Sequence, residues 1–314
     1  MHTAPRRKGG AATLSPASPL EVQAAGRTLR LGGRPWLMGI VNASPDSFSD
    51  DGRGRTLDAQ VDLAAELLAA GADILDVGGE SGRTDTPPVS EEQESALVVP
   101  LVQRLTGELG ALVSVDTYKP AVAEAAVAAG ATVVNDVSGL RDPALAEVCA
   151  RSGAALVLTH TRAEPKQKAL EHPYEDVMDD VLAFLRERIA LAMDRGVARE
   201  QLLLDPGPDC AKSPAQTVEV LRRAGELHAL ERPLLLAVSR KDFIGAIGLR
   251  RPGQRVGGTL AALAHGVDAG AHVLRVHDVA DAAEFLAVRA ALRGDAGLPA
   301  DARVPDHLRR EDTR

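Results

Sequence analysis

Eight short apolar runs alternate with longer helical patterns along this chain, and most of these runs end on a residue that can carry charge or form hydrogen bonds. Strands that alternate with helices form a parallel sheet, and eight such units close into a barrel. The sequence therefore predicts an α/β fold, a (β/α)₈ TIM barrel, in which an active site lies where the carboxyl ends of the strands meet. The predicted strands are 36–41, 72–78, 112–116, 132–135, 154–160, 202–205, 234–239 and 272–277.

Capping residues and glycines mark the ends of the helices between these strands. Ser90 and Gln93 have the spacing of a capping box, in which each side chain satisfies a free backbone amide. Asp142 and Ser213 each precede a proline, whose missing amide hydrogen costs nothing in the first turn of a helix. Glycine adopts the left-handed terminal conformation without strain, and helices are predicted to end at Gly71, Gly130, Gly153, Gly196 and Gly270.

The length of the chain, 314 residues, is sufficient for one large core, and no internal linker divides the sequence. We therefore predict a single barrel domain over residues 21–293. Residues 1–20 and 294–314 are rich in Pro, Ala, Gly or charged residues, and they are predicted to be flexible, disordered tails.

Composition argues against nucleic-acid and membrane partners. The net charge is −8, the basic clusters lie in the two tails, and aromatic residues make up only 2% of the chain, so few side chains could stack on bases. No apolar segment is long enough to span a bilayer, and residues 1–20 contain no apolar signal-peptide core. Because Cys149 and Cys210 fit neither a disulfide framework nor a zinc site, we expect a reducing, cytoplasmic location.

Four polar side chains end the third, fourth, sixth and seventh predicted strands: Asp116, Asn135, Asp205 and Lys241. Taken singly, each could cap a helix or hold a turn. Their common position at strand ends favours one shared pocket. A carboxylate accepts two parallel hydrogen bonds from an amino-pyrimidine edge, an amide both donates and accepts, and an ammonium donates to a ring carbonyl or nitrogen. The set therefore fits a flat, neutral heterocycle.

A second group of side chains is suited to an anion. Arg275 and His277 face the same side of the last predicted strand, and Asn42 ends the first strand, its neighbour in a closed barrel. An arginine fork and a histidine donate to phosphate oxygens, whereas an Asn oxygen suits Mg²⁺. These residues predict a diphosphate site with Mg²⁺ at Asn42. The structural alternative is that Arg275 and His277 form ion pairs with Asp278 or Asp281.

Several ordered motifs resemble those of dihydropteroate synthase, and together they cover nearly the whole predicted barrel. They read MGIVNASPDSFSD at 38–50, DVGGES at 76–81, SVDT at 114–117, NDVSG at 135–139, DPG at 205–207, SRK at 239–241 and RVHDV at 275–279. Signals for other chemistries are missing from the sequence, including a Gly-rich nucleotide fingerprint, a Walker loop and a serine-nucleophile elbow.

The resemblance implies a (β/α)₈ enzyme of folate synthesis, usually a homodimer. Such an enzyme condenses 6-hydroxymethyl-7,8-dihydropterin diphosphate with p-aminobenzoate and releases diphosphate with Mg²⁺. By this resemblance the pterin is bound by Asp116, Asn135, Asp205 and Lys241, while the diphosphate and Mg²⁺ are held by Asn42, Arg275 and His277. Lys241, Arg275 and His277 are the implied catalytic residues, and the loops that begin at Asn42 and Glu80 match mobile segments.

The sequence departs from the family pattern on the p-aminobenzoate side. The usual Thr-Arg-Pro segment has only its arginine, Arg83. Cys210 stands where the family has an aromatic wall, and Asp242 stands where many members have a serine at a helix start that receives the aminobenzoate carboxylate. A fixed anion there would repel that carboxylate.

Three interpretations remain open from the sequence. The first is an active dihydropteroate synthase with a reshaped aminobenzoate pocket. The second is a paralogous transferase that joins the same pterin to another amine. The third is a pterin-binding protein without catalytic activity.

Overall fold

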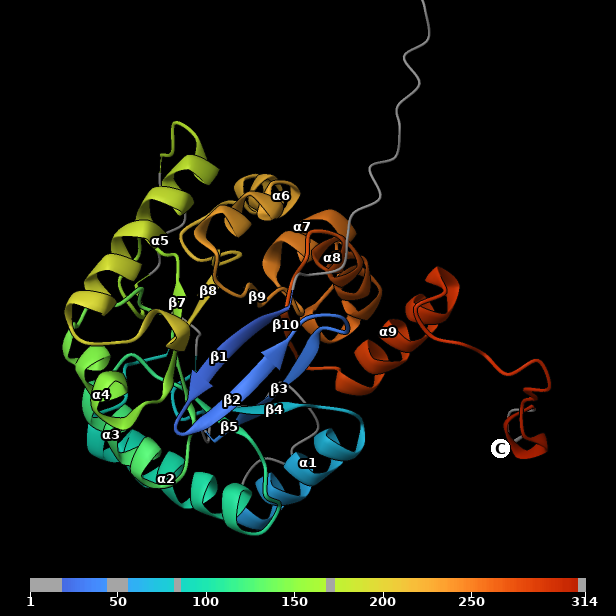
Figure 1. Ribbon diagram of the computed structural model, residues 1–314, viewed down its shortest axis with the longest axis horizontal. Helices are drawn as coiled ribbons and strands as arrows, with labels where there is room; N and C mark the ends of the chain where they lie inside the picture. Colours follow the sequence, from blue (N-terminus) through green and yellow to red (C-terminus); the bar gives the residue numbers. More distant parts are fainter. Residues whose placement is uncertain (1–18, 44–55, 82–85, 168–172, 310–314) are drawn as a thin grey trace, which may run out of the picture.

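Eight parallel strands form one sheet in the order β8-β7-β6-β5-β4-β3-β10-β9 (Figure 1). The computed structural model describes residues 19–43, 56–81, 86–167 and 173–309. A parallel bridge between Leu204 and Leu234 joins the two edge strands and closes the sheet into a barrel. All eight predicted strands are confirmed, as β3 (Trp36–Asn42), β4 (Ile74–Gly78), β5 (Val113–Asp116), β6 (Val133–Asp136), β7 (Ala155–Thr159), β8 (Leu202–Asp205), β9 (Leu235–Leu236) and β10 (Val273–Val276).

Helices follow the strands and form an outer ring around the barrel (Figure 1). The TIM-barrel fold predicted from the sequence is therefore confirmed. No helix of the described ranges combines the length and the apolar character needed to cross a membrane. The ring consists of α1 (Leu57–Ala69), α2 (Glu91–Gly107), α3 (Pro120–Ala128), α4 (Ala144–Ser152), α5 (Val177–Asp194), α6 (Pro214–Arg222), α7 (Asp242–Gly248), α8 (Val256–Asp268) and α9 (Val279–Arg293).

The predicted capping residues hold the starts of these helices. The Oγ atom of Ser90 accepts from the Gln93 amide at 3.2 Å, while the Gln93 side chain accepts from the Ser90 amide at 3.1 Å. Ser213 begins α6 with the same reciprocal arrangement. Asp142 accepts from the Ala144 amide at 2.9 Å. The five glycines predicted at helix ends all have positive φ, as the left-handed conformation requires.

Alternation along the strands sorts the side chains into two layers. Residues such as Leu75 and Val77 point outward and pack against the helices. Ile74, which lies on the opposite face of β4, belongs to a second cluster inside the barrel. Because strand side chains alternate with a period of two, Asp76 also points inward, one layer nearer the carboxyl end. The barrel is thus apolar at its amino end and polar at its carboxyl end.

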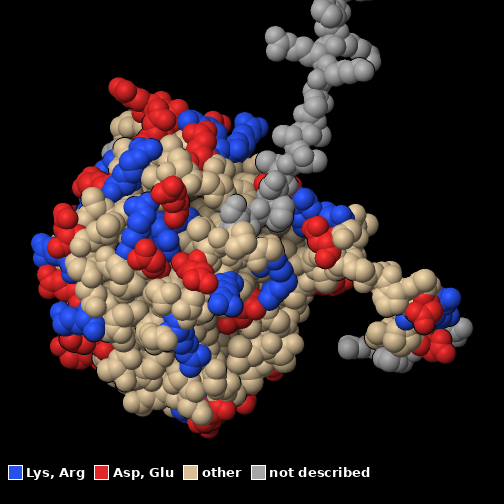
Figure 2. Space-filling model, viewed as in Figure 1, with Lys and Arg blue, Asp and Glu red and all other residues tan. Residues whose placement is uncertain are grey.

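A hairpin that the sequence reading did not predict covers the amino end of the barrel. Strands β1 (Leu20–Ala24) and β2 (Arg27–Leu31) pair in antiparallel register and lie across the barrel (Figure 1). Val22 and Leu31 are fully buried or nearly so and pack into the interior cluster. This face carries interspersed acidic and basic side chains (Figure 2). The hairpin closes this end, so a binding site is confined to the opposite end.

The ends of the chain lie outside the barrel core. Leu20 already belongs to β1, whereas residues 1–18 lie outside the described residues. Beyond Gly294 the described part of the chain, which ends at residue 309, is an exposed segment with one short 3-10 helix, Asp306–Leu308. The barrel and its hairpin are therefore formed by the residues from β1 to α9.

Candidate active site

Polar side chains from several strands converge inside the carboxyl end of the barrel. Asp116 and Asn135 are paired neighbours in the register of β5 and β6. Asp205 ends β8, and Arg275 lies in β10 two residues beyond the buried Val273. Each of these residues follows an inward-pointing apolar or small residue by two positions, which is why side chains distant in sequence share one interior.

Arg275 is the centre of this group. Its Nε atom donates to Asp76 Oδ2 at 2.5 Å, and its Nη2 atom donates to Asp116 Oδ2 at 2.6 Å. The amide of Asn135 also donates to Asp76 Oδ2, at 3.1 Å. Burial alone would lower the pKa of Arg275, but Asp76 and Asp116 raise it above its ordinary value, so the guanidinium stays charged.

The pKa values of two carboxyl groups in this site, those of Asp116 and Asp205, are raised above their ordinary value. Burial raises the pKa of Asp116, opposed by Arg275 and assisted by the nearby Asp76. Burial likewise raises the pKa of Asp205, whose Oδ1 atom accepts from the Gly207 amide at 2.8 Å. The positive charge of Lys241, at the start of α7, opposes this rise in both pKa values without cancelling it. The four residues predicted to bind the heterocycle thus lie around one interior.

Residues at the end of β10 form a second set of contacts. His277 Nδ1 lies 3.0 Å from Ser239 Oγ, which also accepts from the His277 amide at 3.2 Å. The structural alternative, an ion pair between Arg275 and Asp278, is wrong, because Arg275 pairs with Asp76 and Asp116. Asp278 is held instead by Arg240, through two hydrogen bonds. The guanidinium of Arg275 lies inside the barrel and pairs there instead.

Asn42 stands at the rim beside this set. It is the last residue of β3, is exposed, and is in register with Gly78 of β4, while β10 pairs with β3 on the other side. Residues 44–55, which follow it, lie outside the described residues, and so do residues 82–85 with Arg83. In the ranges that are described, no group of three or more His, Cys, Asp or Glu side chains could hold a metal ion.

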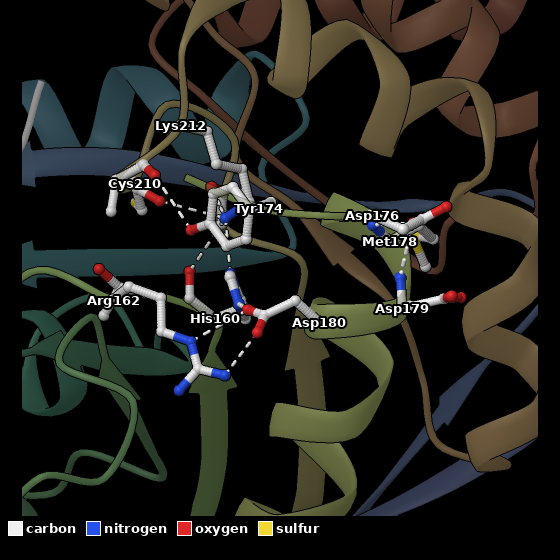
Figure 3. Close-up of polar contacts among 12 residues, drawn as sticks. His160, Arg162, Tyr174, Asp176, Met178, Asp179, Asp180, Cys210 and Lys212 are labelled. Atoms are coloured by element: carbon white, nitrogen blue, oxygen red, sulfur yellow. Dashed lines mark hydrogen bonds and ion pairs between the residues drawn. The ribbon is translucent and has the colours of Figure 1, made fainter. Parts of the chain in front are cut away.

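A buried lysine and histidine form a network beneath the rim (Figure 3). Lys212 Nζ donates to His160 Nδ1 at 2.6 Å, and His160 Nε2 lies 2.9 Å from Asp180 Oδ2. Arg162 holds the same carboxylate through two hydrogen bonds. Burial, followed by the charge of Lys212, lowers the pKa of His160 to about 3, and burial lowers the pKa of Lys212 to about 8. His160 is therefore a neutral ring with a fixed tautomer.

The segment after β8 contains the residues predicted on the aminobenzoate side. Cys210 is partly buried, and its carbonyl accepts from Lys212 at 3.1 Å. The side chain of Asp242 is 87% exposed and pairs with Arg255 at 3.0 Å. Cys149, predicted as a core residue, is fully buried.

The segment after β4 is fixed by a second buried lysine. Lys119 Nζ donates to Glu80 Oε2 at 2.5 Å, to Glu94 Oε2 at 2.6 Å and to the Val89 carbonyl at 2.6 Å. Glu80 also accepts from the Val89 amide at 3.1 Å. Glu80 is thus a structural anchor for the segment that leads from β4 into α2.

Sequence reasoning missed two parts of this site. No role was predicted for Asp76, the first residue of the DVGGES motif, although its period of two from Ile74 places it inside the barrel. The contact of Lys212 with His160 joins residues 52 positions apart and has no local signal. Asp76 depends on partners from β6 and β10, and Lys212 on a residue that follows β7, so neither contact is visible from the local sequence.

A family model described as pterin binding enzyme matches residues 38–277 of this chain. Among curated relatives, the dihydropteroate synthase of Bacillus subtilis (strain 168) is 39% identical over 263 residues, which cover 83% of this chain and 90% of the relative. The family model thus extends from β3 to β10 and spans the barrel.

Solved structures agree with this comparison. The Xanthomonas albilineans dihydropteroate synthase with 4-aminobenzoic acid has a TM-score of 0.81 and 42% identity, and the match covers 88% of this chain and 99% of that chain. The same enzyme in complex with 7,8-dihydropteroate has a TM-score of 0.78 and 41% identity, with 87% and 98% of the two chains covered.

Proposed function

This chain belongs to the family of pterin-binding enzymes, as a transferase of the dihydropteroate synthase type, and from that membership we propose how its barrel rim carries out the reaction. The reaction condenses 6-hydroxymethyl-7,8-dihydropterin diphosphate with p-aminobenzoate, and it gives 7,8-dihydropteroate and diphosphate in folate biosynthesis. The observation that carries the proposal is the partly buried arginine, Arg275, placed between the carboxylates of Asp76 and Asp116.

The pterin is held by the four strand-end residues. Asp116 and Asp205 accept hydrogen bonds from the amino-pyrimidine edge, Asn135 both donates and accepts, and Lys241 donates to a ring carbonyl or nitrogen. The barrel interior buries Asn135 and Asp205, so these hydrogen bonds form where water does not compete. The hydrogen bond from Asn135 to Asp76 fixes the orientation of the Asn135 amide.

The diphosphate leaves toward the rim between β3 and β10. Arg275 and His277 donate to the developing charge as the carbon–oxygen bond at the pterin methylene breaks, and this charge is larger in the transition state than in the substrate. Asn42 fits as a protein ligand of Mg²⁺, because its exposed amide offers one hard oxygen and Mg²⁺ takes most of its other ligands from water and phosphate. When bound, Mg²⁺ supplies further stabilisation of the phosphate charge.

The remaining task of the protein is to place the amine. The electron pair of the arylamine nitrogen attacks the pterin methylene carbon, and the nitrogen then loses a proton to water. An aniline nitrogen is neutral at pH 7, so alignment matters more than a strong base. The start of α7, directly after Lys241, and the segment with Cys210 border the position that this amine takes.

A second copy of the chain is the proposed partner. Ile247 and Leu249, at the end of α7, are 71% and 88% exposed. Large exposed apolar side chains of this kind are typical of protein interfaces. We expect a homodimer in sedimentation experiments, and we expect the double variant Ile247→Glu with Leu249→Glu to sediment as a monomer. A monomeric native protein would contradict the assignment of this surface.

The proposed function is tested by diphosphate release from the purified protein supplied with the pterin diphosphate. Release that depends on an arylamine, together with a pteroate product, is the expected result. Asp116→Asn should abolish most of this activity, whereas Asp73→Asn is the matched control, because Asp73 bonds to Arg34 and the Leu37 amide at the other end of the barrel. Pterin binding without any release would contradict a catalytic role.

A further inference from the structure

A buried lysine holds the turn that follows β8. Lys212 is 5% exposed, and its Nζ atom donates to the Gly207 carbonyl at 2.9 Å and to the Cys210 carbonyl at 3.1 Å. It also donates to His160 Nδ1 at 2.6 Å and reaches the His160 carbonyl at 3.4 Å (Figure 3). In the part of the chain that the structure describes, no carboxylate lies within ion-pair distance of this ammonium, whereas the buried Lys119 pairs with two glutamates.

The turn that Lys212 holds has an unfavourable backbone conformation. Gly207, Asp209 and Ala211 have φ values of +63°, +61° and +52°. For Asp209 and Ala211, which carry a Cβ atom, the left-handed region costs about 1–2 kcal/mol each. A backbone of this kind persists only where neighbouring groups fix it, and such segments are concentrated at binding sites. Lys212 provides this constraint, because its ammonium joins the carbonyls of Gly207 and Cys210.

The same turn supports a residue of the proposed pterin site. Asp205 ends β8, and its Oδ1 atom accepts from the Gly207 amide at 2.8 Å. The carbonyl of Gly207 accepts from Lys212, so a single residue links the ammonium to the carboxylate. Burial raises the pKa of Asp205, and the charge of Lys212 is among those that oppose this rise. Lys212 therefore favours both the position and the ionised form of Asp205.

Groups outside the turn fix the ammonium from the other side. His160 follows β7, and its Nε2 atom lies 2.9 Å from Asp180 Oδ2 of α5. Because Nδ1 accepts from Lys212, the proton of the neutral ring is on Nε2 and is donated to Asp180. The ring also packs edge-on against Phe184 of α5, with the ring centroids 4.9 Å apart. The ammonium is thus anchored to β7 and α5 while it holds the turn after β8.

We propose that Lys212 is a positioning residue for pterin binding, which fixes the turn after β8 so that the carboxylate of Asp205 faces the barrel interior. The inference rests on the proposed function and deepens it, because Asp205 is one of the four residues that hold the pterin there. Lys212 acts through Gly207 and Asp205, and not by its own contact with the pterin. Without the ammonium the turn relaxes, and Asp205 loses the amide that orients it.

The test is the affinity for 6-hydroxymethyl-7,8-dihydropterin diphosphate, measured by calorimetry in the absence of an arylamine. Lys212→Met keeps most of the apolar side chain but has no donor, and we expect the folded variant to bind about tenfold more weakly. Lys212→Gln keeps a donor on a shorter side chain, and we expect a smaller loss of affinity. Unchanged affinity in both variants overturns the inference and leaves the proposed function intact.

Arg232→Met is the matched control. Arg232 is 6% exposed and donates to the backbone carbonyls of Leu202, Glu21 and Glu200, at 3.1, 3.2 and 3.2 Å. It is thus a second buried cation held by carbonyls, at the start of β8 instead of its end. Its loss should lower the free energy of unfolding and leave pterin affinity unchanged. An equal loss of affinity in Arg232→Met and Lys212→Met would make general destabilisation the cause and overturn the inference.

A second comparison tests whether Lys212 acts through Asp205. In the Asp205→Ala background there is no carboxylate to position, so adding Lys212→Met should change pterin affinity by less than about twofold. A further loss of about tenfold in that background contradicts the assigned route. If Lys212→Met does not fold, Lys212→Gln replaces it in both comparisons. A native protein that binds the pterin without releasing diphosphate would contradict the proposed function and leave this inference intact.

Discussion

The guanidinium of Arg275 lies between the carboxylates of Asp76 and Asp116, at 2.5 and 2.6 Å, so one cation serves two anions inside the barrel. Loss of this cation leaves two desolvated carboxyl groups without their main stabilising charge. We therefore predict that Arg275→Ala raises the pKa of Asp116 further. Under the proposed function the pterin binds to the ionised carboxylate of Asp116, so pterin binding should then weaken as the pH falls, beginning at a higher pH than in the native protein.

The same variant should lower kcat by about a hundredfold or more, because we propose that the guanidinium also donates to the departing diphosphate. Pterin affinity measured by calorimetry between pH 6 and 9, together with kcat, checks both effects. Arg289→Ala is the control: Arg289 has the same 18% side-chain exposure and an ion pair with Asp268, but it lies on α9 outside the barrel. An identical pH profile for Arg275→Ala and the native protein would contradict the assigned coupling.

The strand ends were predictable from the sequence because two simple rules act together. Alternation with a period of two places Asn135 two residues beyond Val133, on the same inner face. Parallel strands then bring their carboxyl ends to one rim, which gathers Asp116 and Asp205 there without any knowledge of contacts.

Other parts of the structure depend on partners that the sequence does not reveal. Strand β9 has two residues instead of the predicted six, because Leu234 contributes only a bridge to Leu204 and the chain turns at Arg240 with a positive φ of 59°. The β1–β2 hairpin was missed, although Val22 and Ala24 alternate with exposed residues, since its buried face exists only against the barrel. The contact of Asp209 with the Asp242 amide likewise joins the segment after β8 to the start of α7.

From the lowered pKa of His160 we predict that the free energy of unfolding decreases in mild acid. Its folded-state pKa of about 3 lies below the ordinary value of 6.5, so its contribution to stability is fully present above pH 6.5 and is lost as the pH falls toward 3. Between the two pKa values, each pH unit of acidification lowers the free energy of unfolding by about 1.4 kcal/mol. Between pH 7.5 and 5 we expect His160 to account for a decrease of about 2 kcal/mol in the free energy of unfolding.

The measurement is chemical denaturation of the native protein and of His160→Gln at both pH values. Glutamine can accept from Lys212 and donate to Asp180, and it does not titrate. The variant should lose about 2 kcal/mol less than the native protein over this interval. Lys212, with a pKa of about 8, titrates on the alkaline side and does not add to the difference. Equal losses in the two proteins would remove His160 as the cause.

We predict that the stability of the fold depends strongly on the buried ion pairs of Lys119. Its side chain is 10% exposed and lies between Glu80 and Glu94, whose side chains are 7% and 1% exposed. Removal of one partner leaves buried charges uncompensated, so Lys119→Met should cost about 3–5 kcal/mol in the free energy of unfolding.

The triple variant that adds Glu80→Gln and Glu94→Gln to Lys119→Met should recover part of this loss, because it removes the stranded carboxylates as well. Urea denaturation of the two variants checks this order. The exposed pair of Arg151 and Glu124 serves as the reference, since Arg151→Met should cost at most about 1 kcal/mol. A triple variant no more stable than the single one would mean that packing, and not charge, dominates at this position.

We predict that the turn after Asp205 does not tolerate a side chain at Gly207. Its φ is +63°, and a Cβ atom built there would lie 2.0 Å from the His160 carbonyl oxygen, a distance that requires the backbone to move. Gly207→Ala should therefore displace the amide that Asp205 accepts from, and it should lower both stability and pterin affinity. Gly33→Ala is the control, because Gly33 has a similar φ of +75° with nothing within 4 Å of the added atom. That variant should lose only about 1 kcal/mol of stability, with pterin affinity unchanged in calorimetry. Equal pterin affinities for the two variants would show that the contact with His160 does not position Asp205.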